Sequence, residues 1–253
     1  MNGERQSPVV EHVDGDVKVG VHDRVARVTI DRPSKKNALT QEMYQRMADA
    51  LLEADSDPAI GAVVITGVAD AFTAGNDLAD FMAGNSLDET HRFLEAISTV
   101  HVPLIAAVNG LAIGVGLTLL LHCDLVFVEP TADLSAPFVG LGLVPEAASS
   151  LLLPRIVGER RASEIFLTGR HLSGAEAVEW GLANAAASPV LLAALEAAER
   201  VAAQPRDAAR ASKALLRSPE LTVQGRMAEE MDAFAAALKG PEFAEVMAAR
   251  KAR

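Results

Sequence analysis

The chain has 253 residues, of which 50% are hydrophobic and 23% are charged, the balance of a folded soluble domain. Its net charge of -11 at pH 7 disfavours nucleic acid and anionic membrane surfaces as partners. The longest apolar run, Leu104 to Leu121, is interrupted by Asn109 and three glycines, so no membrane span is expected. A single cysteine, Cys123, excludes an internal disulfide and fits a reducing, cytoplasmic setting. The histidines are few and scattered, so no metal site is expected.

The first half of the chain predicts strands that alternate with helices. Residues Met1 to Asp16 resemble a loose tail, and two β-rich runs then surround a turn at Asp23 and Arg24. Apolar residues at helical spacing follow Thr40, a residue type suited to a helix N-cap. The next expected elements are the strand IGAVVITG, the loop AFTAGNDLADF, a helix at 87–100, the strand PLIAAVNG, the short helix GVGLTLLLH and the strand CDLVFVEP. This alternation favours α/β layering with a mainly parallel sheet.

From Pro145 onward almost every segment has a helical pattern, ending in the Ala-, Glu- and Arg-rich stretch from Glu220 to Lys251. The change of pattern predicts an α/β core over residues 1–190 and a helical C-terminal region over residues 191–253.

A glycine pattern in the middle of the chain offers one alternative function. Gly110, Gly114 and Gly116 lie between an expected strand and helix, and Glu129 ends the next strand, as in a dinucleotide-binding fold. The helix after these glycines is short for a crossover, and isolated glycine fingerprints are weak. The only tyrosine, Tyr44, is followed by QRMA, so the chain has no Tyr-x-x-x-Lys pair to protonate a carbonyl. Dinucleotide chemistry is therefore disfavoured.

Two segments taken together are more specific. AFTAGNDLADF, Ala71 to Phe81, and PLIAAVNGLAIGVGLTLLLHCDLVFV, Pro103 to Val128, resemble the two signature regions of the crotonase superfamily, the enoyl-CoA hydratase/isomerase family. RPSKKNAL, Arg32 to Leu39, is similar to the opening motif of that family, and TGRHLSGAEAVEWGLAN, Thr168 to Asn184, is similar to its later helix-turn. The resemblance implies an α/β fold with a spiral of ββα turns and a helical C-terminal trimerisation region. It also implies an enzyme that stabilises the enolate of an acyl-CoA thioester.

The resemblance assigns this stabilisation to two backbone N–H groups, those of Asn76 after Gly75 and of Val115 after Gly114. Removing a proton next to a thioester puts negative charge on the carbonyl oxygen, and one such donor is typically worth about 10²–10³ in rate. Glycines suit this task because they leave backbone donors unobstructed. A valine at 115, where hydratases usually have glycine, keeps its N–H but needs an ordinary φ. Taken alone, the glycines are better explained by tight strand–helix packing, and it is the pairing of the two segments that favours the donor role.

The acids of the family's hydratases are missing. In those enzymes two glutamates orient a water molecule and shuttle its proton, and the resemblance places them at Thr118 and Phe138 of this chain. Neither residue has a carboxylate, so addition of water by two acids is unsupported.

Glu146 is the remaining candidate base. It is the one acid in LGLVPEAASSLLLP, a segment similar to that of the Δ3,Δ2-enoyl-CoA isomerase branch, in which a single glutamate moves a proton from C2 to C4. Apolar neighbours would raise its pKa toward the range that suits general acid–base catalysis, and a helix N-terminus would lower it. The alternative is that Pro145 opens a helix and Glu146 only complements its dipole.

For coenzyme A, which enters as part of the substrate and not as a separate cofactor, the resemblance implies contacts with Lys36, Ala38, Ala74 and Leu78, beside Gly75 and Gly114. The basic residues expected nearest its phosphates are Arg32, Lys35 and Lys36, with Arg250 and Lys251 as further candidates. As a partner of the chain, the resemblance implies further copies of itself, in a homotrimer or a dimer of trimers.

Two other functions stay open. One is an enoyl-CoA hydratase that uses Asp77 or Asp80 in place of the missing glutamates, although both acids also suit helix capping. The other is a non-catalytic acyl-CoA-binding protein that kept the fold and lost the base.

Overall fold

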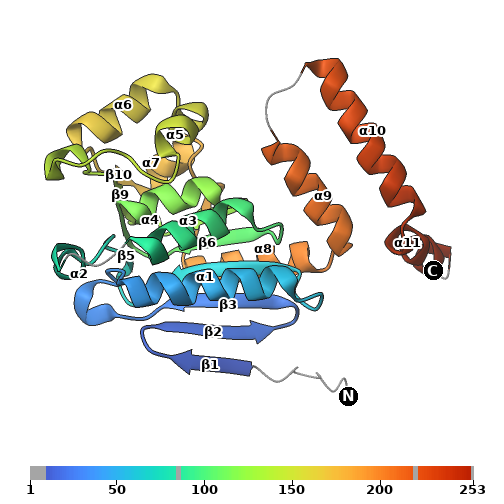
Figure 1. The fold of residues 1–253 in the computed structure, drawn as a ribbon, viewed down its shortest axis with the longest axis horizontal. Coiled ribbons are helices and arrows are strands. Elements are labelled where there is room, and N and C mark those ends of the chain that lie inside the picture. The colour runs from blue at the N-terminus through green and yellow to red at the C-terminus, as the bar shows by residue number, and fades with distance from the viewer. Residues whose placement is uncertain (1–9, 84–86, 219–221, 252–253) are drawn as a thin grey trace.

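The computed structural model describes residues 10–83, 87–218 and 222–251 (Figure 1). The strands are β1 Val10–Asp14, β2 Val17–His22, β3 Val25–Ile30, β4 Ala62–Gly67, β5 Ala71–Thr73, β6 Leu104–Val108, β7 Leu111–Ile113, β8 Leu125–Val128, β9 Asp133–Ser135, β10 Leu172–Ser173 and β11 Ala185–Ala186. The α-helices are α1 Gln41–Ser56, α2 Leu78–Met82, α3 Asp88–Thr99, α4 Val115–Thr118, α5 Ser149–Val157, α6 Glu159–Thr168, α7 Gly174–Glu179, α8 Val190–Ala202, α9 Arg206–Arg217, α10 Val223–Lys239 and α11 Pro241–Lys251. Short 3₁₀ helices are η1 Pro33–Lys35, η2 Leu119–His122 and η3 Val139–Leu141.

The larger sheet has the strand order β1-β2-β3-β4-β6-β8-β11. The first three strands form an antiparallel meander, and every later pairing is parallel. The predicted turn between β2 and β3 is confirmed, with positive φ at both Asp23 and Arg24, as a type I′ hairpin requires. The predicted loose tail is wrong over Val10–Asp14, because β2 offers this segment a complete ladder of backbone partners.

A second, four-stranded sheet has the order β10-β9-β7-β5, and its strands β5, β7 and β9 are parallel. Along the chain, β5 follows β4, β7 follows β6 and β9 follows β8. The chain therefore repeats a pair of strands, one in each sheet, with helices between successive pairs. The predicted α/β class with a crotonase-like spiral is confirmed. Parallel strands end at a common edge, so the loops after β5, β7 and β9 meet there.

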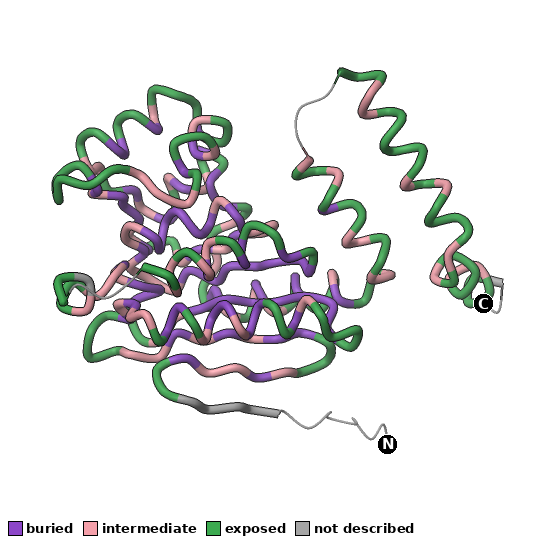
Figure 2. Tube along the Cα trace, in the orientation of Figure 1, coloured by how far each residue is buried: buried purple, intermediate pink, exposed green. Residues whose placement is uncertain are grey.

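The larger sheet is covered on both faces. On β4, Val63 and Ile65 join the cluster built with α1 and α3, whereas Val64 faces α8. Figure 2 shows that the buried residues concentrate in the strands and on the inner faces of these helices. The predicted N-cap of α1 is confirmed, since the Thr40 hydroxyl accepts the Met43 N–H at 3.3 Å.

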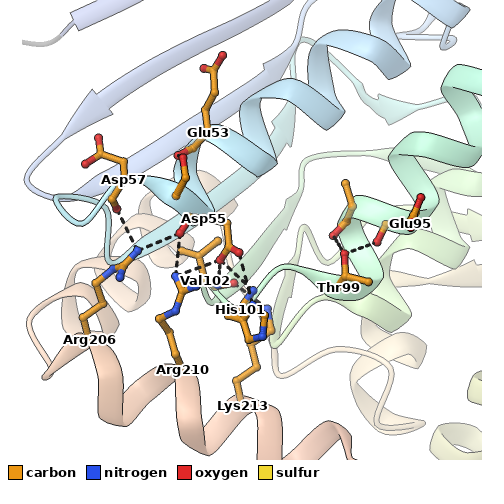
Figure 3. Close-up of polar contacts among 12 residues, drawn as sticks. Glu53, Asp55, Asp57, Glu95, Thr99, His101, Val102, Arg206, Arg210 and Lys213 are labelled. Atoms are coloured by element: carbon orange, nitrogen blue, oxygen red, sulfur yellow. Dashed lines mark hydrogen bonds and ion pairs between the residues drawn. The ribbon is translucent and has the colours of Figure 1, made fainter. Parts of the chain in front are cut away.

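Helix α9 attaches to this body through basic side chains rather than apolar ones (Figure 3). Arg206 and Arg210 donate to backbone carbonyls, among them that of Asp55. Lys213 is 6% exposed and donates to the Val102 carbonyl at 2.7 Å. Helix α10 packs chiefly on α9 and α11, and it stands off from the sheets in Figure 1.

Helix α8 begins at residue 190 and packs on the larger sheet. The division of the chain into residues 1–190 and 191–253 stays a prediction. Within the described ranges, no helix is both long and apolar enough to span a membrane.

Candidate active site

A hollow of about 250 Å³ lies at the shared edge of β5, β7 and β9. Its walls come from the three loops that follow these strands and from the segment after η3. The lining residues are Ala74, Gly75, Asn76, Leu78, Ile113, Gly114, Val115, Pro137, Phe138, Leu141 and Leu143. None of these side chains is charged, so the hollow suits a largely apolar ligand. The few polar atoms of such a ligand would be bound by backbone N–H groups.

The two backbone N–H groups expected to act as donors both belong to this lining. Val115 begins α4, so its N–H has no acceptor within that helix. Across the described part of the chain, no hydrogen bond occupies the N–H of either Asn76 or Val115. The φ angle of Val115 is not positive, so its backbone has the ordinary conformation that a valine side chain requires. The pair therefore offers two free donors to one small space.

Two glycines shape the donor loops, and a third serves packing. Gly75 has φ of +91°, and a Cβ there would lie 2.9 Å from the Ile113 carbonyl oxygen. Gly114 has φ of +59° at the turn into α4. A Cβ on Gly116, by contrast, would lie 2.8 Å from the Thr73 methyl group. Tight packing thus explains Gly116, whereas backbone conformation explains the two glycines that precede the donors.

Glu146 lies beside α4, and its Oε1 accepts a hydrogen bond from the buried hydroxyl of Thr118. The other carboxylate oxygen, Oε2, is buried without a hydrogen-bond partner among the described residues. Burial raises the pKa of Glu146, and the Thr118 hydrogen bond opposes this shift. The charge of Glu146 also acts on the phenol of Tyr44, which is hydrogen-bonded to Asn76. Glu146 is not among the lining residues, but its hydrogen bond to Thr118 ties it to α4, whose first residue, Val115, lines the hollow.

The prediction that Pro145 opens a helix at Glu146 is wrong. Helix α5 begins at Ser149 and has no acid in its first turn. The intervening Ala147 and Ala148 have φ of 52° and 53°, a left-handed turn that non-glycine residues seldom adopt. His122 holds this turn through a contact of 2.8 Å between its Nε2 and the Ala147 carbonyl. Glu146 therefore lies outside the first turn of α5, and a left-handed turn connects it to that helix.

The two neighbouring acids are engaged elsewhere. Asp77 caps α2 by accepting the N–H groups of Ala79 and Asp80, and its Oδ2 lies 2.6 Å from Nη1 of Arg32. The hydrogen bond from Arg32 is the main cause that lowers the pKa of Asp77. Asp80 accepts the N–H of Gln41 at 3.0 Å. Both carboxylates therefore fasten the donor loop to the body.

The residues expected to contact coenzyme A divide into two groups. Ala74, Gly75, Leu78 and Gly114 line the hollow, whereas Lys36 and Ala38 do not. The segment of Lys36 and Ala38 runs beside the donor loop, and the Lys36 carbonyl accepts the Ala74 N–H at 3.0 Å.

The basic residues expected near the phosphates are partly engaged. The Lys36 ammonium is exposed and pairs with Asp70 at 2.6 Å. Arg32 pairs with Asp77, as described above. Of the residues proposed near the C-terminus, Arg250 lies in α11, far along the chain from the hollow. All these binding roles stay predictions.

Sequence reasoning missed the part played by Tyr44. This residue is fully buried on α1, and its hydroxyl donates to the side-chain oxygen of Asn76. Its position on the apolar face of a predicted helix was the only available signal, and it does not distinguish a polar contact from packing. Across the described residues, no cluster of three or more His, Cys, Asp or Glu side chains is arranged to hold a metal ion.

Comparison with known proteins identifies the family of the chain. The model of the enoyl-CoA hydratase/isomerase family matches residues 20–249. The chain belongs to the enoyl-CoA hydratase/isomerase family. A probable enoyl-CoA hydratase of Mycobacterium tuberculosis is 37% identical over 250 residues, covering 94% of this chain and 98% of the relative.

Other members show the range of the family. A 4-chlorobenzoyl coenzyme A dehalogenase of Arthrobacter is 38% identical over 185 residues, covering 69% of this chain and 64% of the relative. The crystal structure of an enoyl-CoA hydratase/isomerase from Pseudoalteromonas atlantica superposes with a TM-score of 0.78. It is 44% identical and covers 92% of this chain and 96% of that one. The chain is thus an enzyme of the enoyl-CoA hydratase/isomerase family, in which relatives of similar identity are named for different reactions.

Proposed function

We propose that this enzyme isomerises 3-enoyl-CoA to 2-enoyl-CoA, with Glu146 as its single base. The observation that carries the proposal is the contact between Glu146 and Thr118. Thr118 occupies a position at which the family resemblance implies a hydratase glutamate, and a carboxylate from another loop reaches the same place. One base next to two free backbone donors suffices to move a double bond, whereas concerted addition of water requires a second acid.

In the proposed reaction, Glu146 takes a proton from C2 of the 3-enoyl thioester. The electrons of that C–H bond move into the conjugated system, and negative charge develops on the thioester oxygen. The N–H groups of Asn76 and Val115 stabilise this dienolate. The carboxylic acid then returns the proton to C4, which leaves the double bond between C2 and C3. No water is consumed, and no cofactor takes part beyond the coenzyme A of the substrate.

The raised pKa of Glu146 supports this role. A base whose pKa approaches the working pH both accepts and returns a proton readily. Oε2, which has no hydrogen-bond partner among the described residues, is the carboxylate oxygen that we assign to that exchange. Asp77, with its lowered pKa and its bond to Arg32, is poorly suited to the same task.

Hydration remains the second candidate, because relatives such as the Mycobacterium tuberculosis protein are named hydratases. The two reactions are separated by incubating the purified enzyme with 3-enoyl-CoA and with 2-enoyl-CoA. We expect conjugation of the first substrate and little water addition to the second. Fast hydration with slow conjugation would overturn the proposal. Inactivity toward both substrates, with coenzyme A esters still bound, would favour a non-catalytic acyl-CoA-binding protein.

We further propose that the enzyme assembles as a homotrimer or a dimer of trimers, mainly through the region after about residue 190. Met227, Met231, Phe234 and Leu238 recur at helical spacing on α10, and each is at least 45% exposed. A continuous apolar face of this kind requires a partner surface. Sedimentation at micromolar concentration is expected to give a trimer or larger, and a stable monomer would contradict the assembly.

A further inference from the structure

The direction of the Asn76 N–H is fixed partly by the backbone of Leu39. The Leu39 N–H donates to the Gly75 carbonyl at 2.8 Å, and the Leu39 carbonyl accepts the Asp77 N–H at 2.9 Å. In a trans peptide, the carbonyl of one residue and the N–H of the next point in opposite directions. Because the Gly75 carbonyl points toward Leu39, the Asn76 N–H points away from it. These bonds set the side on which the donor lies, and they hold the backbone on either side of Asn76 without contacting the Asn76 side chain.

The side chain of Asn76 supplies a further restraint on the orientation of its peptide. Its Oδ1 accepts the hydroxyl proton of Tyr44, which comes from α1. The Tyr44 ring is fully buried and packs on Phe93 of α3, with 5.4 Å between ring centroids. The packing of α1 on α3 therefore holds the Tyr44 side chain in place, and its hydroxyl binds the Asn76 side chain of the donor loop.

We infer that Tyr44 is a positioning residue, which aims the Asn76 N–H at the enolate oxygen by holding the Asn76 side chain. The inference rests on the proposed function, because it assigns a task within the same dienolate chemistry. Tyr44 does not touch the substrate in this scheme. It acts only through Asn76, so its effect must vanish when the Asn76 side chain is absent.

The surroundings of Tyr44 suit this role. Burial, together with the negative charge of Glu146, raises the pKa of the phenol. The hydroxyl therefore keeps its proton and remains a donor to Asn76 while Glu146 gains and loses its own proton. The contact is available in both protonation states of the base.

A double-mutant cycle tests the inference. Tyr44→Phe removes the hydroxyl, and Asn76→Ala removes its acceptor but keeps the backbone N–H. We expect each variant to lower kcat by about three- to tenfold, the value of one hydrogen bond, with little change in KM. The double variant should be no slower than the slower single variant. Multiplicative losses, or a Tyr44→Phe variant with the wild-type kcat, would overturn the inference.

Two further measurements separate this role from a structural one. Leu51→Ala removes buried packing from α1 two turns beyond Tyr44 and leaves the Tyr44 ring and hydroxyl in place, so it should lower the melting temperature while leaving kcat nearly unchanged. Acetoacetyl-CoA serves as a probe, because its enolate carries charge on the thioester oxygen and absorbs in the near ultraviolet. Tyr44→Phe and Asn76→Ala should reduce the bound enolate fraction to the same extent, and Leu51→Ala should not. Equal reduction in all three variants would overturn the inference in favour of general loosening.

The proposed function is tested separately by the wild-type enzyme. If the wild type conjugates 3-enoyl-CoA and the cycle is multiplicative, only the role of Tyr44 fails. If the wild type neither conjugates 3-enoyl-CoA nor binds acetoacetyl-CoA as the enolate, both proposals fail together.

Discussion

Asp77 and Glu146 are two carboxylates close to one hollow, and their surroundings differ in almost every respect. Asp77 accepts two backbone N–H groups and a guanidinium hydrogen bond, and its pKa is lowered. Glu146 accepts one threonine hydroxyl, has one buried oxygen without a partner among the described residues, and its pKa is raised. The first set of contacts stabilises a permanent anion that fastens a loop. The contacts of Glu146 leave a carboxyl group that gains and loses a proton at a modest cost in free energy.

The largest expected effect comes from removing the basicity of Glu146. Glu146→Gln keeps the size of the side chain and an acceptor for Thr118, but it cannot take a proton from C2. We expect conversion of 3-enoyl-CoA to fall by about 10²–10⁴-fold, while binding of coenzyme A esters is retained. Asp77→Asn is the matched control and should lose far less activity. Equal losses of activity in the two variants would show that Glu146 is no more important to the reaction than Asp77.

Next in size is the loss of a backbone donor. Val115→Pro deletes the N–H itself, and we expect kcat to fall by about 10²–10³-fold. Val115→Ala keeps the N–H and serves as the control. Proline is tolerated at a helix start, but circular dichroism must show an intact fold before the loss is assigned to the donor. A Val115→Pro variant that is folded and active would contradict the assignment of this N–H.

The pH dependence of the rate compares the two carboxylates in the wild-type enzyme. Glu146 works as a base only when ionised, and burial raises its pKa from the ordinary glutamate value. The rate of conjugation should therefore rise about tenfold per pH unit below that pKa and then level off. The lowered pKa of Asp77 keeps it ionised throughout this range, so it adds no second step. A flat profile across the same range would show that Glu146 is not the base.

The sequence predicted the α/β class, the hairpin turn and the short helix after Gly114, because each has a strong local pattern. It did not predict β9, since three-residue strands depend on partners rather than on propensity. The sequence left the direction of the Glu146 pKa open, because apolar neighbours would raise the pKa and a helix start would lower it. The turn at Ala147 and Ala148, which separates Glu146 from the start of α5, could not be predicted, because alanine carries no preference for positive φ.

The resemblance to a family, rather than the pattern of residues, supplied the pairing of Asn76 with Val115. The two residues are far apart in the chain, and only the neighbouring strands β5 and β7 bring their N–H groups to one edge. The contact of Glu146 with Thr118 is equally non-local. Such contacts arise from the winding of the chain, which no local spacing encodes.

The smallest expected effect is on stability, and it has opposite signs at the two carboxylates. The pKa of Glu146 is raised in the folded state, so its contribution is fully present at low pH and is lost as pH rises through the folded pKa. The pKa of Asp77 is lowered, so its contribution is present above the ordinary aspartate range and is lost as pH falls through the folded pKa. Urea unfolding at neutral pH should therefore find Glu146→Gln more stable than the wild type. Asp77→Asn should be less stable by about 1 kcal/mol, since it keeps a capping oxygen but loses the pairing with Arg32.

Near the ordinary glutamate pKa, the advantage of Glu146→Gln should shrink, because the wild-type carboxyl is then largely protonated in the folded state. A Glu146→Gln variant that is less stable than the wild type at neutral pH would show that the ionised carboxylate is well solvated or paired. That result would make Glu146 a structural anion like Asp77, and it would count against its use as a base. A gain in stability combined with a loss of activity is the outcome that a proton-exchanging group requires, because the features that raise its pKa are those that destabilise its charged form.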